Sequence, residues 1–177
     1  MPLPLGHAAI GLAVQDVCFR DNSVSKRWAR VLFIAVLANL PDIDVLVGLL
    51  FQGNANAYHR GPTHGLVFTL LMGFLACNAW RLWTRIPKMN FMACAVIILS
   101  HVAADFFLTS SAVSFFWPFE VHWTAGYKGW CDVISLVFLG GFRDLGIIVT
   151  CGAIMILKRV VIQMRYHAFR DSRSGQV

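Results

Sequence analysis

Three short stretches of this sequence combine histidine and aspartate in patterns that can bind a metal ion. LPDID (Leu40–Asp44) carries two aspartates, HRGPTH (His59–His64) carries two histidines, and SHVAAD (Ser100–Asp105) carries one of each. Imidazole and carboxylate groups without a thiolate pair are typical ligands of the divalent ions used in hydrolysis, such as zinc and manganese. His7, in LGHAAIG near the N-terminus, is a further candidate ligand.

The two aspartates of LPDID, Asp42 and Asp44, lie in the middle of an apolar segment, and Asp42 directly follows Pro41. Proline removes a backbone N–H and clashes with the preceding turn, so we expect a helix to break at this point. Two side chains at this spacing point in different directions on a regular helix, but after a break both carboxylates can turn toward one centre. The alternative interpretation is a kink whose carboxylates are hydrogen-bonded to neighbouring groups.

His101 and Asp105 are four residues apart in another apolar segment. On a helix they share one face, about one turn apart, so both can reach the same cation. The aspartate can instead orient the imidazole, as groups behind a metal ligand do. A buried His–Asp hydrogen bond without a metal is the alternative interpretation.

His59 and His64 flank a Gly-Pro dipeptide, which is typical of a tight, shaped turn. Thr63 is a candidate N-cap for a helix that begins at His64. Arg60 can bind an anionic group, because its planar guanidinium suits phosphate or carboxylate. Histidines in a loop are common, so HRGPTH indicates a metal site only in combination with LPDID and SHVAAD.

The segments that carry these residues are strongly apolar. Of the 177 residues, 58% are hydrophobic and 14% are charged, whereas soluble domains average about 45–50% and about 25%. A chain of this length cannot bury such an excess in one core, so we predict an integral membrane protein with a single domain. Basic residues at the membrane face account for the net charge of +6, and we predict no nucleic-acid partner.

We predict an all-α, polytopic membrane bundle with four long transmembrane helices and a short N-terminal membrane helix. The four long segments are close to the ~20 residues that a spanning helix needs: Arg30–Phe51, His64–Trp83, Phe91–Val113 and Leu145–Ile162. The segment His7–Phe19 can be a short span, a re-entrant helix or an interfacial helix, and Cys131–Gly141 is expected at the interface or against the bundle. We place the membrane domain at residues 1–165 and a basic, disordered tail at residues 166–177.

Basic residues indicate how this bundle is oriented. Twelve of the 15 Lys and Arg residues lie before or at the start of the first long segment, between the end of the second and the start of the third, or from the end of the fourth onward. The other three lie in the other two loops. Because Lys and Arg gather on the cytoplasmic side, we expect a cytoplasmic C-terminus. The loop with His59 and His64 then faces outward.

Ionisable side chains inside a membrane cost at least about 2.5–3.5 kcal/mol each on insertion scales, so several together indicate a functional site. In the predicted orientation, the outer ends of the first and third long segments face the start of the second. The candidates of all three stretches can therefore converge. Glu120 and His122, in WPFEVHW, are further candidates for a ligand or a general base, and Trp117, Trp123 and Trp130 are typical of an interfacial aromatic belt.

The motifs occur in a characteristic order. GH at Gly6–His7, LPDID, HRGPTH, SHVAAD and WP at Trp117–Pro118 follow one another along the chain. This ordered set resembles the YdjM family of bacterial inner-membrane proteins, described as metal-dependent hydrolases, over the chain up to Pro118. The resemblance implies a helical membrane hydrolase whose metal-site positions fall on His7, Asp42, Asp44, His59, His64, His101 and Asp105.

Two positions depart from the pattern of that family. Val45 follows Asp44 where family members often have histidine, and Gly65 follows His64 where many have serine. The missing histidine leaves the number of metal ions open. A fainter similarity to soluble zinc-dependent phospholipase C, which also draws His and Asp from separate helices, implies phosphoester chemistry.

We predict a metal-dependent hydrolase of the bacterial inner membrane that cleaves an ester or phosphoester of a lipid or lipid-linked substrate through a metal-activated water. Zn²⁺ is the expected ion, with Mn²⁺ and Mg²⁺ as alternatives. Asp44, His64 and Arg60 are the expected catalytic residues. Two other classes remain open: a metal-ion or proton transporter, and a non-catalytic membrane protein with a structural metal.

Overall fold

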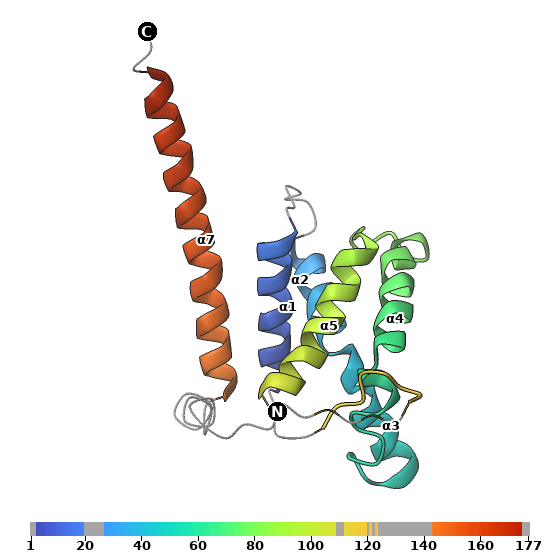
Figure 1. Ribbon diagram of the computed structural model, residues 1–177. Helices are drawn as coiled ribbons and strands as arrows, with labels where there is room; N and C mark the ends of the chain where they lie inside the picture. Colours follow the sequence, from blue (N-terminus) through green and yellow to red (C-terminus); the bar gives the residue numbers. More distant parts are fainter. Residues whose placement is uncertain are drawn as a thin grey trace.

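The computed structural model (Figure 1) describes residues 3–19, 27–108, 112–119, 121, 123 and 143–174, with the side chains of 143 and 168–174 left aside. The described residues are predominantly helical, as predicted. The helices are α1 (Pro4–Cys18), α2 (Arg27–Ala38), α3 (Ile43–Gln52), α4 (Leu66–Asn78), α5 (Phe91–Leu108) and α7 (Arg143–Ser174). Three short 3₁₀ turns accompany them: η1 (Leu40–Asp42), η2 (Pro62–His64) and η3 (Ala79–Arg81).

Four helices, α1, α2, α4 and α5, lie side by side and form the body of the bundle (Figure 1). α5 packs against α1, α2 and α4, and α1 packs against α2. α7 packs along α1 at the edge of the bundle, and its C-terminal half extends past the other helices (Figure 1). α3 and the loop after it lie at one end, where α1 begins and α5 ends. This end positions the predicted site residues.

The hydrophobic core lies mainly between α2 and α5. Ile34, Leu37 and Ala38 of α2 pack with Ile97 of α5, and all four are buried. Gly11 lets α1 approach this layer closely, because a Cβ at this position would lie 2.8 Å from Cβ of Ala38. Small residues at such contacts are typical of helix packing in membranes.

Pro41 divides the first predicted span, Arg30–Phe51. α2 ends at Ala38, η1 follows, and α3 begins at Ile43 with an axis bent by 54° from that of α2. The missing N–H and the bulk of the proline ring explain the bend. The predicted break is therefore confirmed, and α2 with α3 forms a broken candidate span.

The described residues contain two helices long and apolar enough to cross a membrane unbroken, Phe91–Leu108 and Asp144–His167, or three candidate spans with the broken pair. The structure thus differs from the four long helices predicted. The segment His64–Trp83 forms α4, which has 13 residues, between two 3₁₀ turns. Gly65, with extended backbone at φ −92° and ψ 160°, separates η2 from α4 and shortens the helix.

The ends of the chain also differ in detail from the prediction. α1 begins at Pro4, three residues before the predicted short helix, because proline is well suited to a first helical position. α7 continues to Ser174 and so includes residues 166–174 of the predicted tail, among which Ala168, Arg170 and Arg173 favour helix. The predicted interfacial segment Cys131–Gly141 lies outside the described residues.

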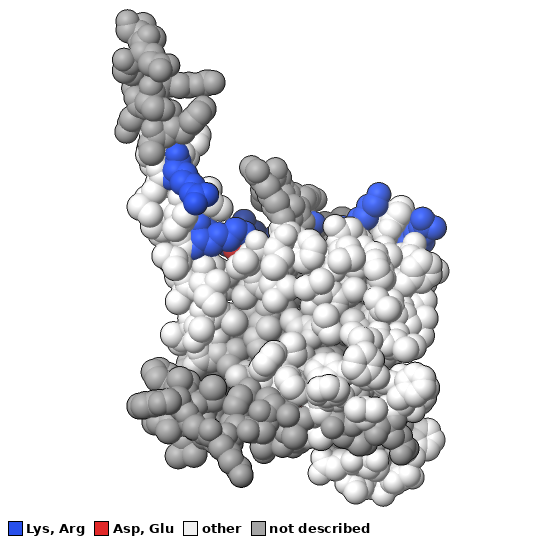
Figure 2. All heavy atoms as spheres, viewed as in Figure 1, with Lys and Arg blue, Asp and Glu red and all other residues white. Residues whose placement is uncertain are grey.

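Lys and Arg gather at one end of the bundle on the face that Figure 2 shows. This end holds the connection between α4 and α5, with Arg81, Arg85 and Lys88, and the part of α7 with Lys158 and Arg159. α3 and the loop after it lie at the opposite end (Figure 1). The charge distribution fits an orientation with the basic end in the cytoplasm.

Candidate metal centre

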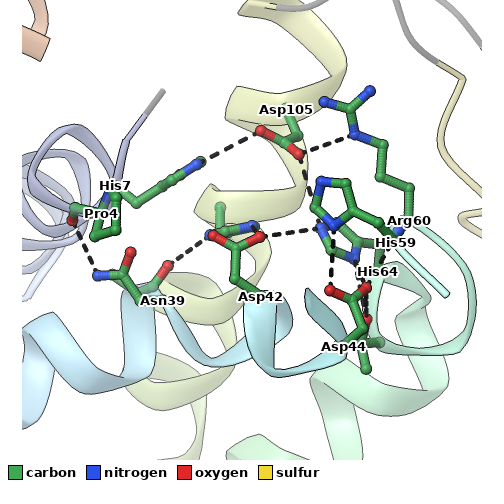
Figure 3. Close-up of polar contacts among 12 residues, drawn as sticks. Pro4, His7, Asn39, Asp42, Asp44, His59, Arg60, His64 and Asp105 are labelled. Atoms are coloured by element: carbon green, nitrogen blue, oxygen red, sulfur yellow. Dashed lines mark hydrogen bonds and ion pairs between the residues drawn. The ribbon is translucent and has the colours of Figure 1, made fainter. Parts of the chain in front are cut away.

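Seven His and Asp side chains meet at the end of the bundle opposite the basic residues (Figure 3). They come from α1, η1, α3, the loop after α3, η2 and α5: His7, Asp42, Asp44, His59, His64, His101 and Asp105. They form three overlapping groups that are spaced so that each can hold a cation. The structure thus brings together every residue of the predicted metal set.

The break at Pro41 places its two aspartates on opposite sides of one imidazole. Oδ1 of Asp42 lies 3.9 Å from Nε2 of His64, and Oδ2 of Asp44 lies 3.3 Å from Nδ1 of the same ring. Asp42 ends the 3₁₀ turn and Asp44 belongs to the first turn of α3, so the backbone between them is irregular. A regular helix could not direct both carboxylates to His64.

Asp44 is surrounded by hydrogen-bond donors. Its carboxylate accepts hydrogen bonds from Nδ1 of His59 at 3.1 Å, the backbone N–H of Arg60 at 3.2 Å and the hydroxyl of Thr63 at 2.6 Å. Nδ1 of His64 lies 3.0 Å from the Thr63 hydroxyl, which can accept its proton. These partners assign the protons of His59 and His64 to Nδ1 and leave both Nε2 atoms with a lone pair.

Thr63 therefore has a different place from the predicted one. The N-cap of α4 is Gly65, which has no side chain to cap the helix, and α4 begins at Leu66. The prediction of Thr63 as an N-cap of a helix starting at His64 is wrong, because η2 and extended Gly65 separate the two. The Thr63 hydroxyl instead connects Asp44 to His64.

A main-chain carbonyl orients His101. Nδ1 of His101 donates to the carbonyl oxygen of Ala38 at 2.7 Å. In a regular helix this oxygen would accept from the N–H of Asp42, but that N–H donates to the Asn39 carbonyl in the 3₁₀ turn. The break in the helix thus releases the acceptor that His101 uses. Nε2 of His101 is left 3.4 Å from Oδ1 of Asp42.

His7 completes the buried part of the site. Its ring stacks on His101 with centroids 3.7 Å apart, and its Nε2 lies 3.5 Å from Oδ1 of Asp105. The other oxygen of Asp105 lies 3.7 Å from Nε2 of His64 and accepts a hydrogen bond from Nε of Arg60 at 3.2 Å. Asp105 of α5 therefore lies between the histidines of α1 and η2 (Figure 3).

The distances among these atoms fit a shared cation better than hydrogen bonds. The separations of 3.4, 3.5, 3.7 and 3.9 Å exceed the usual hydrogen-bond range. Zinc–nitrogen distances near 2.0–2.1 Å would place tetrahedral ligands about 3.3–3.4 Å apart. Nε2 of His7, His64 and His101 is buried and has no hydrogen-bond partner among the described residues, which is costly for a polar atom without a bound ion. The donor set and its spacing fit a divalent metal.

Three side chains of the site are partly exposed. The side chains of Asp42, Arg60 and His59 are 19%, 10% and 8% exposed, whereas those of the other residues of the centre are essentially buried. Arg60 has a left-handed backbone with φ 67°, which is uncommon for a residue with a side chain. Its carbonyl accepts from the N–H of Ser114, so the chain after α5 helps to hold this conformation.

Residues 112–119 lie against the loop that carries Arg60 and His64. The N–H of Leu66 donates to the Phe115 carbonyl at 2.9 Å, and Val113 pairs with Trp123 in an isolated antiparallel bridge. Glu120, His122 and Trp130 lie outside the described residues.

Two further residues, which the sequence analysis did not identify, support the site. Asn39 donates from Nδ2 to the Pro4 carbonyl at 3.0 Å, and the Asp144 carboxylate accepts from the backbone N–H of Leu3 and Gly6. Their polar side chains next to apolar segments were the visible signal. Nothing in the sequence indicates that their partners lie at the start of α1.

Comparison with known proteins gives consistent results. A family model described as YdjM inner membrane protein matches residues 1–168, which extends well beyond the last shared motif at Pro118. The inner membrane protein YbcI of Escherichia coli (strain K12) is 34% identical to this chain over 125 residues, which cover 68% of the chain and 69% of YbcI. No solved structure is significantly similar.

Proposed function

The chain belongs to the YdjM family of inner membrane proteins, and we propose that it is a metal-dependent hydrolase of that membrane. One observation carries the proposal. Three buried imidazole Nε2 atoms, which have no hydrogen-bond partner among the described residues, face two carboxylates in two overlapping groups, each spaced so that it can hold an ion. Such a donor set suits zinc or manganese.

Four buried residues and the partly exposed Asp42 would hold metal, in two groups that share His101. Nε2 of His7, His64 and His101 and the carboxylates of Asp42 and Asp105 are the proposed ligands. A divalent ion held there would supply Lewis-acid polarisation of the scissile ester and would promote ionisation of the hydrolytic water. Asp44 was predicted from sequence as a ligand and catalytic residue. Its three hydrogen-bond donors, and Nδ1 of His64 at 3.3 Å, favour a role in orienting His59 and His64.

His59 is the proposed proton acceptor. Its Nδ1 donates to Asp44, which leaves Nε2 to accept a proton from the attacking water. The Nε2 atom is buried and has no hydrogen-bond partner among the described residues, although 8% of the side chain as a whole is exposed. A carboxylate behind the imidazole stabilises the charge that forms on the ring.

Arg60 is the proposed anchor for an anionic group of the substrate. Its Nε donates to Asp105, and the planar guanidinium can pair further with a phosphate or carboxylate. The centre lies beside helices whose outer faces are apolar, as expected for contact with lipid. These features support a lipid or lipid-linked phosphoester as substrate, with its tail in the bilayer.

Metal content and hydrolysis, measured on the same preparation, test the proposal. Wild-type protein purified in detergent is expected to retain zinc or manganese and to cleave a phosphodiester or ester lipid analogue. His101→Ala should lose both properties. Ser100→Ala is the matched control, because the neighbouring hydroxyl donates to its own helix at the Ile97 carbonyl. The proposal would be ruled out if wild-type protein bound no metal, or if His101→Ala cleaved the lipid analogue as well as wild type does.

The broken span favours one second candidate, a metal-ion or proton transporter. Discontinuous helices with carboxylates at the break are a feature of transporter binding sites, and α2 and α3 meet at a 54° bend beside Asp42. Metal uptake into proteoliposomes, in the absence of hydrolysis of any ester tested, would support transport instead.

A further inference from the structure

The first turn of α1 is capped by a residue of another helix. The N-cap residue of α1, Leu3, has no side-chain group that can bind the free backbone N–H groups. The Asp144 carboxylate, at the start of α7, accepts the N–H of Leu3 at 2.7 Å with Oδ1 and that of Gly6 at 3.1 Å with Oδ2. An aspartate in this geometry does for α1 what an N-cap side chain does within a helix.

This cap lies directly beside a residue of the metal centre. Gly6, whose N–H is bound by Asp144, precedes His7 in the chain. His7 reaches the centre only from this turn, and Nε2 must stay within 3.5 Å of Asp105. Loss of the cap would remove the acceptor of the Leu3 N–H and leave the Gly6 N–H with only the Leu3 carbonyl, 2.9 Å away. Unpaired backbone groups are costly near the membrane. The first turn would then rearrange or fray.

Asn39 also holds this turn of α1. Its Nδ2 donates to the Pro4 carbonyl from the end of α2 (Figure 3). The start of α1 is thus held by Asp144 of α7 and by Asn39, the residue that follows α2. Together these contacts fix the direction in which His7 leaves the helix.

A second polar contact joins α1 to α7 at the far end of the same interface. Asp16 lies 3.6 Å from Nζ of Lys158 and 3.8 Å from Nη2 of Arg159. Between the two ends, Ala13 packs against Ile147 and Cys151. Asp16 and Asp144 therefore both stabilise the α1–α7 pair, but only Asp144 lies beside His7.

We propose that Asp144 is a positioning residue of the metal centre: by capping α1 from α7 it fixes Nε2 of His7 against Asp105 and His101. The expected effect on metal binding rests on the proposed metal function, whereas the cap of α1 by Asp144 does not. It gives α7, which carries none of the proposed ligands in its described residues, a role in the site. That role passes through two backbone N–H groups and one histidine.

Two measurements on the full-length protein in detergent test this proposal. The first is the ¹⁵N imidazole spectrum of the metal-free protein, in which the His7 signals are identified by their loss in His7→Ala. The second is the dissociation constant for Zn²⁺, with the visible spectrum of the Co²⁺ form as a report on ligand geometry. Asp144→Ala, Asp144→Asn and the matched control Asp16→Ala are compared with wild type.

Asp144→Ala is expected to shift the His7 signals and to weaken Zn²⁺ binding by roughly 10-fold or more, as loss of a group behind a ligand does. Asp144→Asn keeps one acceptor oxygen and should show a smaller loss. Asp16→Ala should leave the His7 signals, the Zn²⁺ affinity and the Co²⁺ spectrum unchanged, even where both alanine variants lower the thermal stability.

The two proposals fail in different ways. Unchanged His7 signals in Asp144→Ala, or equal shifts in Asp16→Ala, would overturn the positioning role whether or not metal binds. A shift of the His7 signals in protein that binds no metal would uphold the positioning of His7 and refute the metal function instead.

Discussion

α5 and α7 are both long and apolar enough to cross a membrane, yet they have opposite places in the molecule. Half of the α5 candidate span is buried within the bundle, against 11% of that of α7. α5 carries His101 and Asp105 on its buried face. Of the polar residues of α7 that contact α1, Asp144 stands at the start of the span and Lys158 stands just past its middle, and neither is buried. The position of ionisable residues, rather than overall hydrophobicity, thus distinguishes the helix that forms the site from the helix that supports it.

The largest effect is expected at Asp105 of α5. Asp105→Asn keeps the size of the side chain but removes the charge that faces His7, His64 and Arg60. Metal binding should fall by more than the ~10–100-fold that loss of an outer partner causes. Metal content and isothermal titration measure this. Retention of wild-type affinity would remove α5 from its central place in the site.

A cavity in α5 should cost far more stability than one in α7. Ile97 is fully buried, so Ile97→Ala should lower the free energy of unfolding by about 2–5 kcal/mol. The matched change Ile156→Ala, on an exposed face of α7, should stay within about 0.5 kcal/mol. Thermal unfolding in detergent compares the two variants. Similar losses would mean that α7 packs more extensively than this structure has it.

Asp44→Asn tests whether the two aspartates Asp44 and Asp105 have different roles, with Asp105 binding the metal and Asp44 orienting the histidines. Because Asp44 holds the Nδ1 atoms of His59 and His64, its loss should weaken metal binding by about 10–100-fold without abolishing it. Titration of wild type, Asp44→Asn and Asp105→Asn side by side ranks the two aspartates. If Asp44→Asn is as damaging as Asp105→Asn, then Asp44 is itself a ligand.

The smallest difference concerns two glycines. Gly11→Ala would place a Cβ 2.8 Å from Ala38 and should destabilise the α1–α2 contact by about 1–3 kcal/mol. Gly152→Ala in α7 meets no atom within 4 Å and should stabilise the helix by up to about 1 kcal/mol. The midpoints of thermal unfolding should therefore move in opposite directions. A stabilising Gly11→Ala would show that α1 is free to move away from α2.

Residue types and spacing predicted the side chains that meet in the centre, because His and Asp within apolar segments have few other reasons to be there. Pro41 likewise predicted the break that places Asp42 and Asp44. The number of long helices was harder to predict, since the shortening of α4 depends on the backbone conformation of Gly65 rather than on hydrophobicity. The family match was foreseen from the ordered motifs, although it extends beyond them.

The groups that orient the proposed ligands could not be predicted from the sequence in the same way. His101 is oriented by a main-chain oxygen, and the start of α1 is capped by a residue more than 130 positions away in sequence, as the separations of 141 and 138 show. Backbone acceptors are the same in every residue, and a partner at such a distance follows from the packing of whole helices. These contacts could be found only in three dimensions.

The hydrogen bond from His101 to the Ala38 carbonyl determines which substitutions in this region can alter the orientation of His101. Because the acceptor belongs to the main chain, every amino acid at position 38 supplies it, and a substitution there acts through the contact with Gly11. The position that governs this acceptor is Pro41, since a continuous helix would return the oxygen to the N–H of Asp42. The orientation of the His101 imidazole therefore depends on the amino acid at position 41, three residues after the one whose carbonyl accepts the hydrogen bond.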